Sequence, residues 1–225
     1  MERPSVAAIV VAAGNSTRMG TNKQLLMLGD RPVIAHTLTA FQNTPAVSEI
    51  VLVTRAEDIE VLRALAVQYG ISKVTAVVAG GAERQDSVAN GVAACSNTAA
   101  YFAIHDGARP LATPELITAV IDAAIQHGAA AAAVRVKDTV KVADKNGFIV
   151  DTPDRATLWN VQTPQVFERS LYIAALESAR VNGLSVTDDC RLAEAAGYPV
   201  LLVEGSYANL KITTPEDIRI AEGWL

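Results

Sequence analysis

The sequence is poor in cysteine, and it lacks the cysteine spacings of a metal site. Only Cys95 and Cys190 occur among 225 residues, and neither belongs to a C-x-x-C pair. This pattern is typical of a reduced intracellular protein and gives no sign of a disulfide framework or a structural zinc site. We therefore expect two free and inert thiols.

Long apolar runs and an excess of positive charge are also missing. The longest N-terminal apolar run, 6–13, is too short to cross a membrane, and no cationic segment precedes it. We therefore expect no membrane segment and a cytoplasmic location. Nineteen Lys and Arg face 24 Asp and Glu, giving a net charge of -5, which argues against a general affinity for nucleic acid. A small anion held in a local basic cleft stays compatible with this balance.

Apolar, β-branched runs alternate with segments of helical period, which predicts an α/β chain. Because strand–helix alternation favours parallel strands, we predict a Rossmann-like open, mostly parallel sheet with helices on both faces, in a single domain over residues 1–225. Ligands of such sheets bind beyond the carboxyl ends of the strands. The predicted strands are 6–12, 49–54, 73–78 and 100–105, and the predicted helices are 32–42, 56–69, 86–95 and 114–127. Thr113 and Thr214, each followed by proline and an acid, read as helix N-caps.

Residues 136–153 break the alternation and read as two strands around Asn146-Gly147, a strong hairpin signal. An uncovered ladder is an aggregation hazard, so this segment is expected to pack on something. The sequence leaves two interpretations about equal. One is an arm, 136–156, that packs on a second subunit and forms a homodimer, and the other is an edge hairpin of the same domain.

The loop after the first predicted strand, Ala12-Ala13-Gly14, is neither a P-loop nor a G-x-G-x-x-G turn. Its small residues leave the backbone open to a ligand, and the cations Arg18 and Lys23 follow closely. A polyphosphate site and an ordinary solvated loop fit this stretch equally well.

Two further strand ends carry similar chemistry. Gly80-Gly81 precede Arg84 and Ser87 at the start of a predicted helix, where backbone N–H groups favour anions. Ser87 or Asp86 also suits a plain helix cap.

Asp106 ends the fourth strand, where one carboxylate beside phosphates is a natural Mg²⁺ ligand. Arg109 is placed to hold a second anion, whereas we expect His105 to make a structural hydrogen bond. Together these loops indicate a nucleoside triphosphate site with a metal.

Stretches in a fixed order resemble the nucleotidyltransferases that make CDP-linked polyols, and most closely the 2-C-methyl-D-erythritol 4-phosphate cytidylyltransferase family. They are AAGNSTRMG (12–20), KQLL (23–26), GGAERQDSV (80–88), HDGARP (105–110), VKDTVK (136–141), QTPQVF (162–167), TDD (187–189) and NLKITTPEDI (209–218). The resemblance implies cytidylyl transfer from CTP to a polyol phosphate in the non-mevalonate isoprenoid pathway, with Mg²⁺. This chain departs from the family in several places, among them Asn22 before Lys23, where proline is common.

The resemblance also implies a role for each matching residue. Cytosine and ribose would be bound by Ala12, Ala13, Gly14, Gly81, Ala82 and Ser87. Arg18 and Lys23 would hold the triphosphate, and Asp106 would lie by the metal and the reacting phosphates. The acceptor pocket would comprise Arg109, Thr139, Arg155, Thr163, Thr187 and Lys211, with Thr139 and Arg155 reaching the neighbour's site from the arm.

Three rival functions are weighed against this one. A ribitol-5-phosphate cytidylyltransferase would share the architecture, and only a few acceptor contacts separate the two, among them HDGARP and TDD. A non-catalytic nucleotide-binding regulator would need neither a metal site nor a second anion pocket, so Arg109, Arg155 and Lys211 argue against it. A dinucleotide-dependent dehydrogenase lacks support from the loop pattern.

Overall fold

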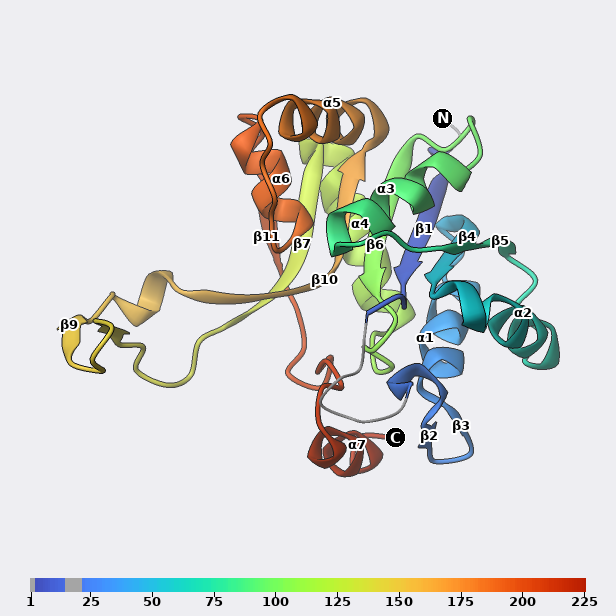
Figure 1. Ribbon diagram of the computed structural model, residues 1–225, viewed down its shortest axis with the longest axis horizontal. Helices are drawn as coiled ribbons and strands as arrows, with labels where there is room; N and C mark the ends of the chain where they lie inside the picture. The colour runs from blue at the N-terminus through green and yellow to red at the C-terminus, as the bar shows by residue number, and fades with distance from the viewer. Residues whose placement is uncertain (1–2, 15–21) are drawn as a thin grey trace.

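A seven-stranded sheet forms the centre of the computed structural model, which describes residues 3–14 and 22–225 (Figure 1). The strand order is β11-β7-β10-β6-β1-β4-β5, and all neighbours pair in parallel except β10, which is antiparallel to both β6 and β7. The strands are β1 (Val6–Val11), β4 (Val47–Thr54), β5 (Val74–Ala79), β6 (Tyr101–Asp106), β7 (Ala129–Arg135), β10 (Trp159–Glu168) and β11 (Leu201–Glu204). The expected mostly parallel sheet is confirmed.

Helices cover both faces of this sheet. They are α1 (Val33–Gln42), α2 (Ile59–Gln68), α3 (Arg84–Ala94), α4 (Pro114–His127), α5 (Arg169–Val181), α6 (Asp189–Ala195) and α7 (Pro215–Glu222). Short 3₁₀ turns, η1 (Lys23–Leu25), η2 (Ala56–Asp58) and η3 (Arg155–Thr157), and the small pair β2 (Met27–Leu28) and β3 (Arg31–Pro32) complete this part of the fold. The four predicted strands and four predicted helices are present, with ends within three residues; η2 opens the helix predicted to begin at residue 56.

Alternate side chains of β1 enter two separate apolar cores. Val6, Ala8 and Val10 pack with α1, α2 and α4, whereas Ala7 and Ile9 pack with α3, α5 and α6. Because strand side chains alternate between faces, a strand that is apolar throughout requires cover on both sides. This double cover leaves the ends of the strands as the places where polar side chains gather.

The predicted helix caps and free thiols are present. The Thr113 side chain accepts a hydrogen bond from the Leu116 N–H, and Thr214 forms a capping box with Asp217. Both cysteines are free and buried, and burial raises the pKa of each thiol. Low thiolate content makes them poor nucleophiles.

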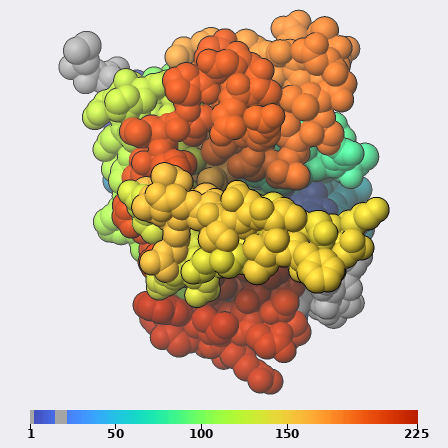
Figure 2. All heavy atoms as spheres, turned by 90° about the vertical axis from the view of Figure 1, so that its left-hand side faces the viewer, coloured from blue at the N-terminus to red at the C-terminus, as the bar shows by residue number. Residues whose placement is uncertain are grey.

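The hairpin forms an arm that extends beyond the body of the molecule in Figure 1 and crosses the face turned to the viewer in Figure 2. Its strands, β8 (Val142–Ala143) and β9 (Ile149–Asp151), make a separate two-stranded sheet, and Gly147 in the turn has a φ of 87°. The edge-hairpin interpretation is wrong, because neither strand pairs with the seven-stranded sheet. Phe148 is 71% exposed at the tip, and Ile149 and Val150 beside it are also exposed.

No helix among the described residues combines the length and the apolar character that crossing a bilayer requires.

Candidate active site

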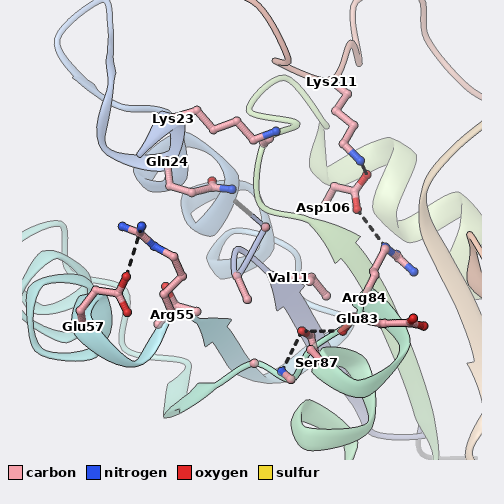
Figure 3. A pocket seen from close by; sticks show the side chains of 17 residues that line it. Val11, Lys23, Gln24, Arg55, Glu57, Glu83, Arg84, Ser87, Asp106 and Lys211 are labelled. Carbon is pink, nitrogen blue, oxygen red and sulfur yellow. Dashed lines mark hydrogen bonds and ion pairs between the residues drawn. The ribbon is translucent and has the colours of Figure 1, made fainter. Parts of the chain in front are cut away.

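A pocket of about 360 Å³ opens at the carboxyl ends of β1, β4 and β6 (Figure 3). Its walls come from the segments that follow β1, β4 and β5 and from η1, with Lys211 entering from the segment before α7. The lining residues are Val11, Ala13, Gly14, Lys23, Gln24, Thr54, Arg55, Glu57, Gly80, Gly81, Ala82, Glu83, Arg84, Ser87, Asp106, Ala108 and Lys211. The crevice lies where an open parallel sheet is expected to bind its ligand.

One wall of the pocket is bare backbone fixed by Ser87. The Ser87 hydroxyl accepts a hydrogen bond from the Gly81 N–H at 3.1 Å and donates to the Glu83 carbonyl at 3.0 Å. Glu83 caps α3 in a capping box with Asp86, so Asp86 contributes to the cap as its third helical residue. A Cβ on Gly80 would come within 2.5 Å of the Ala13 Cβ, so glycine is required there for the two loops to meet.

Lys23 reaches the same pocket from η1, and Asn22 holds the start of that turn. The Asn22 side chain accepts from the Gln24 N–H and donates to Asp58 at 2.8 Å, while Arg55 donates to the same Asp58 oxygen at 2.7 Å. The Lys23 ammonium donates to the Ile212 carbonyl at 3.0 Å. Asn22 therefore fixes this turn by hydrogen bonds to the backbone of the turn and to Asp58.

Asp106 lies at the centre of a cluster of cations. Its carboxylate oxygens are 2.9 Å from Lys211 Nζ, 3.5 Å from Arg84 Nε and 3.6 Å from Arg109 Nε. Burial alone would raise the pKa of Asp106, but the positive charges of Lys211, Arg84 and Arg109 outweigh it and hold that pKa well below its usual range. The carboxylate is therefore ionised at neutral pH.

A chain of hydrogen bonds joins Asp106 to His105 through Thr163. The Thr163 hydroxyl oxygen accepts from the Asp106 N–H at 3.0 Å and lies 3.0 Å from His105 Nδ1, while His105 Nε2 lies 3.3 Å from the Arg109 carbonyl. Burial lowers the pKa of His105 to about 4, so its ring is neutral at pH 7. Nε2–H then donates to the carbonyl and Nδ1 accepts from Thr163. The structural hydrogen bond expected for His105 is confirmed.

A second, smaller pocket of about 160 Å³ shares Arg84, Asp106 and Lys211 with the first. Its remaining lining residues are Arg109, Val161, Gln162, Thr163, Gln165, Thr187 and Asp188. Arg109 is buried here, where its Nη1 donates to the Asn209 carbonyl at 2.8 Å and its Nε has no hydrogen-bond partner among the described residues. The two cavities meet at the Asp106 cluster, so two ligands can be brought together there.

The structure brings most of the expected site residues to these two pockets. Ala13, Gly14, Lys23, Gly81, Ala82, Ser87 and Asp106 line the larger one, Arg109, Thr163 and Thr187 line the smaller one, and Lys211 lines both. Ala12 instead directs its side chain into the core, and Arg18 lies outside the described residues.

Two expected acceptor residues, Thr139 and Arg155, lie on the exposed arm and line neither pocket. Arg155 Nη1 donates to the Lys137 carbonyl at 2.7 Å within the arm itself. Their distance from the pockets of their own chain is what a role in a neighbour's site requires.

Sequence reasoning gave no site role to Gln24 and Thr54, and it named Arg84 at the start of a helix without assigning it a partner. Gln24 and Thr54 each carry a buried side-chain oxygen that has no hydrogen-bond partner among the described residues. Arg84 lines both pockets and pairs with Asp189 at 2.6 Å. The stretches KQLL and GGAERQDSV contained Gln24 and Arg84, but no local pattern indicated that Asp189 would pair with Arg84.

The described residues hold no group of three or more His, Cys, Asp or Glu side chains close enough to bind a metal ion unaided. The donor set still suits Mg²⁺, because this ion takes one or two carboxylates together with phosphate oxygens and water. Asp106 is an ionised carboxylate in the wall of both pockets, so it is the side chain that would hold such an ion beside bound phosphates.

Comparisons with known proteins place the chain among enzymes of one family. The chain is 48% identical over 220 residues to the 2-C-methyl-D-erythritol 4-phosphate cytidylyltransferase of Pelotomaculum thermopropionicum, covering 96% of this chain and 92% of that one. It is 46% identical over 224 residues to the enzyme of the same name from Caldanaerobacter subterraneus, covering 98% and 99%. The crystal structure of the 4-diphosphocytidyl-2C-methyl-D-erythritol synthase of Anaerococcus prevotii superposes with a TM-score of 0.88 at 32% identity, covering 99% of both chains. The family model described as "2-C-methyl-D-erythritol 4-phosphate cytidylyltransferase" matches residues 6–225, and the chain belongs to that family.

Proposed function

We propose that this chain transfers the cytidylyl group of CTP to 2-C-methyl-D-erythritol 4-phosphate. The products are 4-diphosphocytidyl-2-C-methyl-D-erythritol and pyrophosphate, in the non-mevalonate route to isoprenoid precursors. The observation that carries this assignment is the meeting of two pockets at the Asp106 cluster, in a chain that matches the family over residues 6–225. The larger pocket suits the nucleotide and the smaller one the acceptor phosphate.

The acceptor is itself the nucleophile. The second pKa of a phosphate monoester is near 6, by analogy with phosphoamino acids, so the acceptor carries a reactive oxyanion at neutral pH. That oxygen attacks the α-phosphorus of CTP in line, the bond from the α-phosphorus to the bridging oxygen breaks, and pyrophosphate leaves with the electron pair. No general base is needed, in keeping with a neutral, buried His105 that faces Thr163.

Catalysis then consists of positioning and charge neutralisation. The Ser87 loop and the small residues after β1 would hold cytosine and ribose through backbone groups, and Lys23 and Arg18 would hold the triphosphate. Lys211 and Arg109 would orient the acceptor phosphate from the smaller pocket. Mg²⁺ held by Asp106 and phosphate oxygens would supply further positive charge for the leaving pyrophosphate.

We also propose that the enzyme acts as a homodimer in which the arm of one protomer completes the site of its partner. Two observations support this. The arm presents exposed apolar side chains at Phe148, Ile149 and Val150, and Arg155 and Thr139 lie on it away from the pockets of their own chain. A cytoplasmic location stays a prediction from the sequence.

Pyrophosphate release tests the reaction directly. The protein is incubated with each of the four nucleoside triphosphates against 2-C-methyl-D-erythritol 4-phosphate and ribitol 5-phosphate, with Mg²⁺ or with EDTA. We expect release only with CTP, the methylerythritol acceptor and Mg²⁺. Preference for ribitol 5-phosphate would establish the rival transferase, and CTP binding without release would favour a regulator.

Lys23→Ala tests the triphosphate assignment within the same assay. Removing one cation from the transition state is expected to cost about 3 kcal/mol, by analogy with the loss of one oxyanion-hole donor. Arg63→Ala is the matched control, because Arg63 lies on the exposed face of α2 in an ion pair with Glu60. Turnover in Lys23→Ala equal to that of the control would remove Lys23 from the reaction.

A further inference from the structure

Arg84 stands between two buried carboxylates. Its Nη1 is 2.6 Å from Asp189 Oδ2 and its Nε is 3.5 Å from Asp106 Oδ1, and it lines both pockets. Burial alone would lower the pKa of Arg84, but Asp189 and Asp106 outweigh it, so the guanidinium stays charged. Figure 3 shows Arg84 reaching from the start of α3 toward Asp106 and Lys211.

Asp189 is held in place from three sides. It is 3% exposed; its Oδ1 accepts a hydrogen bond of 2.5 Å from the Tyr172 hydroxyl, and its N–H donates to Gln165 Oε1 at 3.1 Å. Tyr172 is fully buried and packs against the rings of Phe102 and Phe167. A carboxylate this buried requires a charge partner and hydrogen bonds, and Arg84 and Tyr172 provide them.

The charges of the cluster explain why a second carboxylate is needed. Asp106 alone faces three cations, Arg84, Arg109 and Lys211. Without Asp189, the Arg84 guanidinium would have Asp106 as its only carboxylate partner among the described residues. A closer ion pair between them would make the Asp106 oxygens less accessible from the two pockets. With Asp189 in place, the guanidinium is divided between the two carboxylates, with Nη1 on Asp189 and Nε toward Asp106.

We propose that Asp189 and Tyr172 are positioning residues that hold Arg84 at the junction of the two pockets, where Arg84 contacts the reacting phosphates. This inference rests on the proposed function and assigns that site a further cation. Arg84 then neutralises charge as the acceptor oxygen approaches the α-phosphorus. Asp189 and Tyr172 act only through Arg84, because both are buried and neither lines the two pockets.

The proposal is tested by steady-state pyrophosphate release with CTP and acceptor varied separately, in a cycle of Asp189→Asn, Arg84→Gln and the double variant. Loss of a residue that orients a metal ligand typically lowers activity 10- to 100-fold; by analogy, we expect kcat of Asp189→Asn to fall by about that factor, with smaller changes in KM. Arg84→Gln should lower kcat at least as much. In the Arg84→Gln background, Asp189→Asn should cause little further loss, because its partner is already gone.

Tyr172→Phe and Glu49→Gln complete the design. Tyr172→Phe deletes one hydroxyl and should also lower kcat, again only when Arg84 is present. If Asp189→Asn does not fold, Tyr172→Phe provides the test in its place. Glu49→Gln is the matched control, a buried carboxylate that accepts from the Ser96 N–H at 2.9 Å near the opposite end of β4. It should lower stability and leave kcat unchanged.

The possible results separate the two proposals. A wild-type protein that releases no pyrophosphate from any pair of substrates would defeat the proposed function itself. An active wild type with unchanged kcat in both Asp189→Asn and Tyr172→Phe would overturn only the positioning role. The same conclusion would follow if these changes lowered kcat equally with and without Arg84.

Discussion

Lys211 Nζ lies 2.9 Å from Asp106 Oδ2 at the point where the larger and the smaller pocket meet. Lys211 comes from the segment before α7, whereas Asp106 ends β6 in the centre of the sheet. The pair therefore joins the C-terminal part of the chain to the centre of the sheet, and it places one cation in the wall of both pockets.

Lys211→Ala is expected to impair use of the acceptor more than use of CTP. Asp106 stays ionised in this variant, because Arg84 and Arg109 remain beside it. The catalytic efficiency for the acceptor should fall on the order of 100-fold, as for the loss of one transition-state donor. Kinetics with each substrate varied in turn measure the difference, with Arg63→Ala as control. An unchanged acceptor KM and kcat would contradict the assignment of Lys211.

Mixing two inactive variants tests whether the arm serves a neighbouring site. Arg155→Ala removes the arm's cation, and Lys23→Ala disables the pocket of its own chain. In a mixed dimer, the Arg155→Ala protomer keeps Lys23 and receives an intact arm, so pyrophosphate release should return when the two are combined. The control replaces Lys23→Ala with a chain that carries both changes, which should restore nothing. Failure to recover activity between subunits that exchange freely would refute sharing of the arm.

Gly80→Ala is expected to weaken CTP binding selectively. The new Cβ would come within 2.5 Å of the Ala13 Cβ and 2.7 Å of the Ser87 hydroxyl, so the two loops that form the nucleotide wall must separate. We expect KM for CTP to rise about tenfold, equivalent to ~1.4 kcal/mol, with a smaller change for the acceptor. Gly223→Ala is the control, because its Cβ would meet nothing closer than 3.4 Å. An unaltered KM for CTP would show that the loops tolerate the separation.

His105 should make stability depend on pH between about 4 and 6.5. Its folded-state pKa of about 4 lies below the ordinary value of 6.5, so the unfolded chain binds a proton first as the pH falls. The free energy of unfolding should therefore fall with pH across this window, by about 2 kcal/mol between pH 7 and pH 5 from this residue alone. The folded-state pKa of Asp106 is depressed below 3.8. The stability that its ion pairs provide is therefore present across this window and is lost only at lower pH.

Urea unfolding of the wild type and His105→Gln at pH 7 and pH 5 measures this contribution. The variant is expected to be less stable at pH 7 and to lose less stability on acidification. The change in stability between the two pH values must be compared, because the loss of a buried side chain by itself destabilises the variant at both pH 7 and pH 5. Equal losses in the two proteins would show that His105 does not titrate in this window.

Local sequence determined the strands, the helix caps and the small residues at the strand ends, because these depend on periodicity and on backbone chemistry within a few residues. The Thr113 and Thr214 caps and the turn at Gly147 formed as their sequence patterns predict. The carboxyl ends of parallel strands share one edge, so the convergence of Gly14, Gly81 and Asp106 also followed from the sequence.

Only the tertiary structure decided which distant charges meet. Arg84 pairs with Asp189, and Lys211 with Asp106, because β10 and the segments that follow it return to the same sheet edge. The hairpin pattern also did not predict that the arm would form a separate sheet. A turn signal determines where the chain reverses, but not the surface on which the hairpin packs. Residue type and spacing describe each loop, but the sharing of cations between carboxylates depends on how the whole chain is folded.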